Sequence, residues 1–223
     1  MARYEDKFLV PTSSFSEIYN IFEFDKINFK KIFPTRHVNS IYYDLHNLYF
    51  ARQNLNGDGL REKIRIRFYD NNLIDANLEV KYKQYSVGKK QVVPIKLSHR
   101  LPNSRLLLSH LNEYKFLDAK QILELHPKLF IRYKRSYWAS NMFKGIRITL
   151  DSNILAKQVS ISNSLVSLFD HACQFQDVAV LEIKYDSQTN IDQFKKYFQI
   201  CFNLRRSKFS KYMIGLIQTS QIT

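Results

Sequence analysis

The chain has 223 residues, of which 45% are hydrophobic and 14% aromatic, so it can bury a substantial core and is not a disordered tail. Lys and Arg number 34 against 20 Asp and Glu, a formal net charge of +14, which predicts an anionic partner: nucleic acid, a membrane surface or a phosphorylated small molecule. No apolar run approaches about 18 residues and no signal peptide is apparent, so we expect a cytoplasmic protein without a membrane span.

The predicted elements form one domain over residues 1–223, because no low-complexity linker divides the chain. Helical segments carry apolar residues at i, i+3, i+4 and i+7, as at Phe15, Ile18, Tyr19 and Phe22. Runs of strand with few crossover helices favour an α+β class, with an antiparallel sheet or barrel and helices added to it. In chain order we predict strand 4–10, helix 13–22, strands 38–45, 62–70, 76–84 and 89–97, helices 104–114 and 119–127, strands 128–138, 145–152 and 179–187, and helices 191–202 and 207–218.

The segment GLREKIRIRFYD, residues 59–70, has cations at alternate positions of a predicted strand: Arg61, Lys63, Arg65 and Arg67. All four side chains therefore point to one face of the sheet, about 6.6 Å apart along the strand. At an effective dielectric near 20, each adjacent pair repels by roughly 2.5 kcal/mol if partly buried, whereas water and salt remove most of this on an open surface. The row is either a solvated outer face or a binding site for a polyanion.

Four other predicted strands also separate a polar, ion-rich face from an apolar one. If the apolar faces pack against helices, the charged faces are exposed to water in an open sheet or line the lumen of a closed barrel. A ladder of cross-strand ion pairs is a second interpretation of the same pattern. The polar faces carry Glu5 and Lys7, Glu79 and Lys81, Arg147 with Thr149 and Asp151, and Glu182 with Lys184.

Familiar catalytic and metal-binding motifs are missing from the sequence. The six histidines show no HExxH or HxH spacing, and the two cysteines form no CxxC pair. The stretch VGKK at 87–90 lacks the upstream glycine of a P-loop, so phosphate binding here must use side chains. We expect no nucleic acid as partner, because the sequence has neither an RNP-like aromatic strand nor a Gly-rich or Arg-rich tail.

Nine stretches in chain order resemble the catalytic domain of the vacuolar transporter chaperone (VTC) polyphosphate polymerases, within the triphosphate tunnel metalloenzyme superfamily. They are RYEDKF, HVNSIYYD, LREKIRIRFYD, LEVKYK, KKQVVPIK, YKRSYW, GIRITLD, LEIKY and SKFSKYM. The resemblance covers nearly the whole chain. It implies a closed antiparallel β tunnel of about eight strands, with helices packed outside and a lumen lined by Arg, Lys and a few carboxylates.

The resemblance also implies a role for individual residues. Glu182 in LEIK matches the metal-binding glutamate, and Glu5 and Glu79 are secondary carboxylates. Lys90 matches the lysine that follows the third of these strands in the family, with a register that is uncertain by one residue because Lys89 precedes it. Lys208 and Lys211 match lysines on the last helix, where a three-residue spacing puts both on one face. The implied catalytic residues are Arg65, Arg67, Lys81, Arg135, Arg147 and Glu182, and the implied phosphate-binding residues are Lys7, Arg65, Arg67, Lys81, Lys90, Arg135, Arg147, Lys184, Lys208 and Lys211.

The implied activity is transfer of the γ-phosphate of ATP to a growing inorganic polyphosphate chain, with Mn²⁺ or Mg²⁺ on Glu182. Two alternatives remain open: a triphosphate or nucleoside-triphosphate hydrolase of the same fold, and a non-enzymatic protein that binds polyphosphate or RNA. No regulatory domain is visible in the sequence, and the oligomeric state is not indicated.

Overall fold

Antiparallel strands make up most of the regular structure in the computed structural model, which describes residues 3–26, 28–84, 87–111, 118–175, 178–186, 189, 191–202 and 204–219. The chain divides into unit 1, Met1–His37, Tyr133–Ile154 and Phe175–Ser210, and unit 2, Val38–Arg132, Leu155–Gln174 and Lys211–Thr223. The expectation that residues 1–223 act as a single domain stays a prediction.

The strands are β1 Arg3–Pro11, β2 Phe29–Asp44, β3 Leu60–Tyr69, β4 Asn72–Gln84, β5 Val87–Ile95, β6 His126–Ser140, β7 Arg147–Gln158, β8 Cys173–Gln174 and β9 Val178–Asp186. The helices are α1 Thr12–Phe24, α2 Tyr49–Asn56, α3 Ser104–Leu111, α4 Ala119–Leu123, η1 Val166–Phe169, α5 Ile191–Phe202 and α6 Lys211–Gln218.

The nine strands form one sheet in the order β1-β9-β7-β6-β2-β3-β4-β5, with β8 paired to β7 off this path. Within the described residues no ladder joins β1 to β5, so the prediction of a closed barrel is wrong. Closure requires every strand to be paired on both sides, and β5 contains Pro94, whose nitrogen has no hydrogen to donate to a further strand. Closure was implied by the family resemblance, whereas the alternation along the strands is equally compatible with an open sheet.

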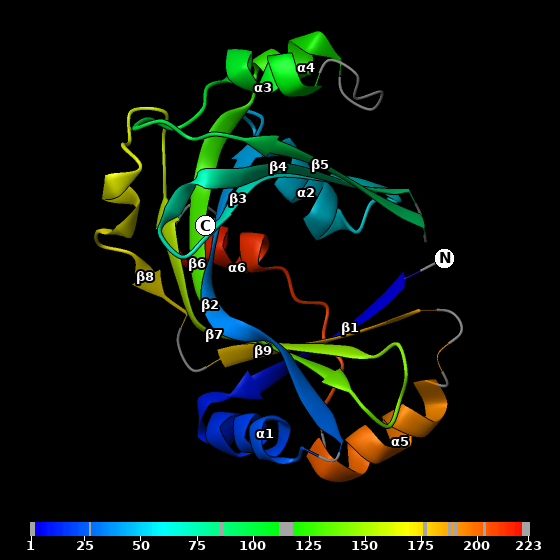
Figure 1. Cartoon of the computed structure of the whole chain (residues 1–223). Helices are drawn as coiled ribbons and strands as arrows, with labels where there is room; N and C mark the ends of the chain where they lie inside the picture. Colours follow the sequence, from blue (N-terminus) through cyan, green and yellow to red (C-terminus); the bar gives the residue numbers. More distant parts are fainter. Residues whose placement is uncertain are drawn as a thin grey trace. The chain divides into compact units, whose positions relative to one another are not determined.

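Unit 1 has an aromatic core between its strands and two helices. In Figure 1, α1 (blue) and α5 (orange) lie on the same side of the strands of this unit. Helix α5 places Phe194, Phe198 and Phe202 four residues apart on one face, and the ring of Phe198 lies 4.9 Å from that of Phe8 on β1. Trp138 of β6 is fully buried in the same cluster. This packing leaves the other face of β1, β9 and β7 for polar side chains.

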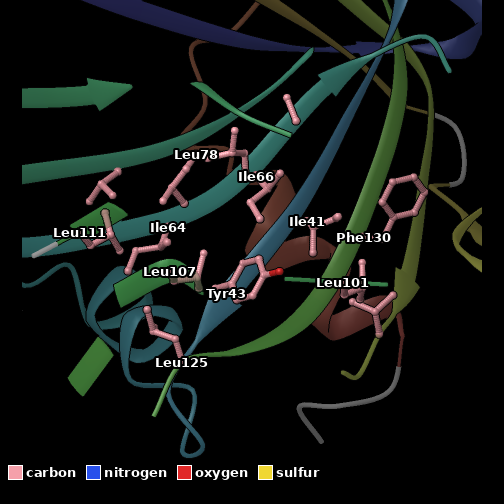
Figure 2. Close-up of a cluster of buried hydrophobic side chains, with 14 of the residues drawn as sticks. Ile41, Tyr43, Ile64, Ile66, Leu78, Leu101, Leu107, Leu111, Leu125 and Phe130 are labelled. Atoms are coloured by element: carbon pink, nitrogen blue, oxygen red, sulfur yellow. The ribbon is translucent and has the colours of Figure 1, made fainter. Parts of the chain in front are cut away.

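Unit 2 has a second core, and Figure 2 shows part of this cluster of buried hydrophobic side chains. Ile64 and Ile66 of β3, Leu78 of β4 and Ile41 of β2 are fully buried on the apolar face of these strands. Leu107 and Leu111 of α3 and Leu125, which follows α4, close over this cluster. Because side chains alternate along each strand, the residues between these buried positions lie on the opposite face. They include the cations of β3.

Several predicted boundaries differ from the structure. Helix α5 confirms residues 191–202, but α4 ends at Leu123, because the chain enters β6 at His126 and includes Pro127 in that strand. Strand β2 begins at Phe29, nine residues before its predicted start. Helix α2 has no counterpart among the predicted elements, because its capping group, Asp44, is the last residue of the preceding strand. Residues 112–114 of the predicted helix 104–114 lie outside the described residues, so that part of the prediction is not assessed.

Candidate functional site

The polar face of unit 1 is built by three neighbouring strands in register. Lys7 of β1 is opposite Glu182 of β9, which is opposite Thr149 of β7. In the next row, Glu5 is opposite Lys184, which is opposite Arg147. Residues directly opposite in antiparallel strands share a face, so all six side chains project to the same side of the sheet.

Two lysines and two carboxylates alternate across this face. The Lys7 ammonium lies 3.1 Å from Glu5 Oε1 and 3.7 Å from Glu182 Oε1. The Lys184 ammonium lies 3.3 Å from Glu182 Oε2 and 4.0 Å from Glu5 Oε2. The Glu182 side chain is only 7% exposed, whereas the lysines are about one-third exposed. The buried carboxylate is thus held by cations that retain access to solvent.

Arg135 of β6 is fixed on the same face by buried acids. Its Nε and Nη2 donate to the two oxygens of Asp151, the second at 2.6 Å, and Nη2 also donates to Glu182 Oε2 at 3.3 Å. Burial lowers the pKa of Arg135, but Asp151, Tyr133 and Glu182 outweigh it and raise the pKa well above its usual value. The guanidinium therefore stays charged in a fixed orientation.

Oxygen donors of unit 1 match the requirements of a small divalent cation. Among the described residues, no group of three or more His, Cys, Asp or Glu side chains could hold a metal ion alone. Mg²⁺ and similar ions are, however, usually held by one or two carboxylates together with substrate phosphates and water. Glu182 and Glu5 supply two carboxylates, and the buried Thr149 hydroxyl beside Glu182 has no hydrogen-bond partner among the described residues. The donor set fits such a cation.

The polar face of unit 2 centres on Glu79 of β4. Its Oε2 accepts from Arg65 Nε at 2.7 Å and lies 3.7 Å from Arg67 Nη1, while Oε1 accepts from the Lys90 ammonium at 2.7 Å. Burial raises the pKa of Glu79, but Arg65, Arg67 and Lys90 outweigh it and lower the pKa to about 2. One carboxylate thus serves as counterion to three cations, and this cluster carries excess positive charge.

Tyr42 of β2 extends this cluster toward α6. Its hydroxyl accepts from Arg65 Nη1 at 3.2 Å, and its ring stacks on Tyr212 of α6 with 4.8 Å between centroids. The Tyr212 hydroxyl donates to the buried Asp44 carboxylate at 2.8 Å. Burial raises the pKa of Tyr42, but Arg65, Arg67 and Lys211 outweigh it and lower the pKa. Lys211, at the start of α6, therefore contributes to the positive electrostatic potential at this face.

The structure separates the predicted site residues into two groups. Lys7, Arg135, Arg147, Glu182 and Lys184 lie on the polar face of unit 1, and Arg65, Arg67, Lys81 and Lys90 lie on that of unit 2. Lys81 is directly opposite Lys90, which places Lys90, and not Lys89, on the charged face.

One pair of predicted residues does not share the expected helix. Lys208 precedes α6 and belongs to unit 1, whereas Lys211 is the first residue of α6 and belongs to unit 2. The expectation that both lie on one helical face is therefore wrong. The reason is that the chain from Arg205 to Ser210 takes a non-helical path, fixed where Ser207 N donates to the Lys7 carbonyl at 2.7 Å.

Three polar groups of these faces were not selected from the sequence as site residues: Asp151, Tyr42 and Thr149. Thr149 and Asp151 follow Arg147 at alternate positions of one strand, so the sequence alone predicts that the three side chains lie on one face of the sheet. Their partners come from other strands, and only the fold shows that Asp151 orients Arg135. Within the described part of the chain, no helix is long and apolar enough to cross a membrane.

Two solved structures have a fold similar to that of this chain. HpAC1 of Hippeastrum, a proposed adenylyl cyclase with a dominant triphosphatase activity, superposes with a TM-score of 0.55 at 12% identity, covering 100% of this chain and 98% of that one. PH1819 of Pyrococcus horikoshii OT3 superposes with a TM-score of 0.50 at 16% identity, covering 97% and 98% of the two chains. These similarities show a shared fold. No curated protein matches the sequence.

The VTC domain profile matches residues 2–219, almost the full length of the chain. This match confirms the resemblance carried by the nine strand and helix motifs. The chain belongs to the VTC domain family.

Proposed function

We propose that this protein is a metal-dependent phosphotransferase that moves the γ-phosphate of ATP onto inorganic polyphosphate. The observation that carries the proposal is the pair of polar faces in which arginines are held by largely buried carboxylates, Arg135 by Asp151 and Arg65 by Glu79. Such arginines are already oriented and desolvated, so they bind phosphate oxygens without reorganising. Membership of the VTC domain family supports the same class of substrate.

The chemistry needs positioning and charge neutralisation more than covalent help. A terminal oxygen of the polyphosphate chain attacks the γ-phosphorus of ATP, the bond from that phosphorus to the β–γ bridging oxygen breaks, and ADP leaves with that oxygen. Arg135 and Arg147 neutralise the transferring group in unit 1. Arg65 and Arg67 bind non-bridging phosphate oxygens in unit 2.

A divalent cation completes the charge balance in this proposal. Mn²⁺ or Mg²⁺ would be held by Glu182 and Glu5, with the Thr149 hydroxyl beside them. When bound, the ion supplies Lewis-acid stabilisation of negative charge on phosphate oxygens. Lys7 and Lys184, which now lie against both carboxylates, can turn their ammonium groups to the substrate because they are about one-third exposed.

A triphosphatase is the competing proposal. If water takes the place of the terminal phosphate oxygen, the same residues hydrolyse triphosphate or nucleoside triphosphates. The triphosphatase activity of HpAC1, which shares the fold, favours this alternative. A protein that binds polyphosphate without turnover is the third possibility, and it requires no metal.

Substitutions in the two faces test the proposal. Glu182→Gln is expected to lower metal-dependent ATP turnover by at least roughly 100-fold while tripolyphosphate affinity is retained, because it removes an anion and leaves every cation in place. Arg67→Ala should weaken tripolyphosphate binding roughly tenfold or more and also lower turnover, since charge-assisted hydrogen bonds act in both states. Glu17→Gln, at an exposed position of α1 in unit 1, is the matched control. Unchanged turnover in folded Glu182→Gln and Arg67→Ala proteins would refute the proposed roles.

A further inference from the structure

Phe33 and Arg36 of β2 meet Tyr137 of β6 in unit 1, in a group that we call the aromatic–arginine cluster. Arg36 Nε donates to the Tyr137 hydroxyl at 3.2 Å. The Arg36 guanidinium carbon lies 5.3 Å from the centroid of the Tyr137 ring and 5.7 Å from that of the Phe33 ring. The two rings lie edge to face, with 5.6 Å between their centroids. Each planar group is therefore held in place by the other two.

This cluster shares a face of β6 with the arginine that we place in the reaction. Tyr137 follows Arg135 by two residues, whereas Trp138, the next residue, is buried in the aromatic core of unit 1. Since side chains alternate along a strand, Tyr137 and Arg135 project to the same side, about 6.6 Å apart along the strand. A ligand whose phosphates lie at Arg135 therefore has the cluster within reach.

Phe33 is the member of the cluster that faces solvent. It is 51% exposed, whereas Tyr137 is 9% exposed. The proline at position 34 restricts the backbone of Phe33 to extended conformations. Beside it, the hydroxyls of Thr35 and Ser136 lie 2.9 Å apart and tie β2 to β6. A flat apolar ring is thus kept at the surface, next to a cation that the same cluster orients.

A planar cation beside an exposed ring is a stacking surface for a nucleobase. Bases stack on aromatic rings and on the plane of an arginine side chain, and this contact accepts any base because every base has a π face. Tyr42 beside Arg65 and Tyr133 beside Arg135 are both buried, so neither of these rings offers such a surface. An exposed phenylalanine alone needs no explanation, but the oriented arginine and the proximity to Arg135 favour a base that is joined to phosphates.

We propose that Phe33, Arg36 and Tyr137 form a subsite for the base of the nucleotide substrate. The adenine of ATP stacks on the Phe33 ring and the Arg36 guanidinium while the triphosphate is bound on the polar face at Arg135. This inference rests on the proposed function, because it assumes that the phosphoryl donor is a nucleotide. It goes beyond that function in naming residues that distinguish ATP from an inorganic tripolyphosphate, which has no base. Because stacking does not read base edges, GTP should bind about as well as ATP.

The test compares ATP with inorganic tripolyphosphate. Binding of each is measured by calorimetry for the intact chain and for Phe33→Ala, at several salt concentrations and with a metal chelator present to suppress turnover. We expect Phe33→Ala to lose roughly tenfold of its affinity for ATP, the effect of one lost stacking contact, and none for tripolyphosphate. The slope of log affinity against log salt should stay the same for ATP, because no cation is removed. Phe33→Trp, which keeps a flat ring, should retain the affinity for ATP.

Two further variants separate stacking from charge and from surface hydrophobicity. Arg36→Lys keeps the positive charge without the planar guanidinium, and should weaken ATP binding several-fold with tripolyphosphate affinity unchanged. The matched control, Phe24→Ala, removes an exposed phenylalanine from the end of α1 in the same unit and should change neither affinity. If Phe33→Ala unfolds by circular dichroism, Phe33→Leu, which keeps apolar volume but no ring, is measured with the same expectation.

Unchanged ATP affinity in folded Phe33→Ala, equal losses for ATP and tripolyphosphate, or an equal effect of Phe24→Ala would overturn the base subsite. Failure of the proposed function gives a different result. If replacement of Phe33 weakens ATP binding but the intact chain forms no polyphosphate from ATP, the subsite stands and the polymerase proposal fails. If polyphosphate forms and the KM for ATP is the same in Phe33→Ala, the subsite fails and the polymerase proposal stands.

Discussion

Replacing Glu79 by glutamine tests whether the carboxylate is the resident counterion of the unit 2 cations. The pKa of Glu79 falls from its ordinary value of 4.5 to about 2, because Arg65, Arg67 and Lys90 outweigh its burial. A shift of this size corresponds to about 3 kcal/mol of stability at neutral pH. Glutamine keeps the volume and some hydrogen bonding but not the charge. We expect Glu79→Gln to lower the free energy of unfolding by about 2–3 kcal/mol at pH 7.

The sign of the pH dependence follows from the depressed pKa. The stabilisation by Glu79 is fully present above pH 4.5, the unfolded value, and is lost as the pH falls toward about 2. The difference between Glu79→Gln and the unaltered chain should therefore be largest at pH 7 and shrink between pH 5 and pH 3. The control Glu124→Gln, at an exposed position of the same unit, should change stability by less than about 0.5 kcal/mol at any pH.

Two assays isolate the effect. Urea denaturation followed by far-ultraviolet circular dichroism gives the free energy of unfolding, and hydrogen exchange of the β3 and β4 amides reports on unit 2 by itself. Tripolyphosphate should stabilise Glu79→Gln more than the unaltered chain, because the ligand then supplies negative charge to Arg65 and Lys90 in place of the Glu79 carboxylate. A loss below about 0.5 kcal/mol, or a loss of equal size at pH 7 and pH 3, would refute the counterion reasoning.

Three further predictions concern other buried polar groups. Burial raises the pKa of Glu62 to about 7, so ionisation of this carboxyl destabilises the folded chain as the pH rises through that value. Glu62→Gln should therefore raise the free energy of unfolding, measured by urea denaturation, by up to about 2 kcal/mol at pH 8 and leave it unchanged at pH 4. Asp151→Asn leaves the Arg135 guanidinium buried without its paired charge, and should cost about 3–5 kcal/mol, read from denaturation followed by tryptophan fluorescence. Tyr212→Phe removes a hydrogen-bond donor from the buried Asp44 carboxylate and should cost about 1–3 kcal/mol, detected as faster hydrogen exchange in α2.

The strand faces were predictable from the sequence because period-two alternation is local. Arg65 and Arg67 alternate with Ile64 and Ile66, and the structure buries both isoleucines while it places both arginines against Glu79. The uncertain register of Lys90 could not be resolved in the same way, because it depends on how β5 pairs with β4. Pairing across strands, and not local pattern, determines which of two adjacent lysines reaches a carboxylate.

Closure of the sheet and contacts between distant segments were not predictable. Alternation is the same in an open sheet and in a barrel, so only the strand order shows that β1 and β5 remain edges within the described residues. Asp151 and Arg135 are 16 residues apart on different strands, and nothing local links them. Helix α2 depends on Asp44, whose carboxylate accepts from the Phe50 and Ala51 amides, and a lone aspartate at a strand end gives no helical signal.

The products formed from ATP and Mn²⁺ test the central claim most directly. A polymerase should release ADP together with acid-insoluble phosphate chains and little free phosphate, and the chains should be resolved by length on a gel. Glu182→Gln, with its cations intact, should form neither product. Free phosphate in step with ADP and no polymer, at several metal and ATP concentrations, would contradict the polymerase proposal and favour the triphosphatase. Neither ADP nor phosphate would favour a polyanion-binding protein.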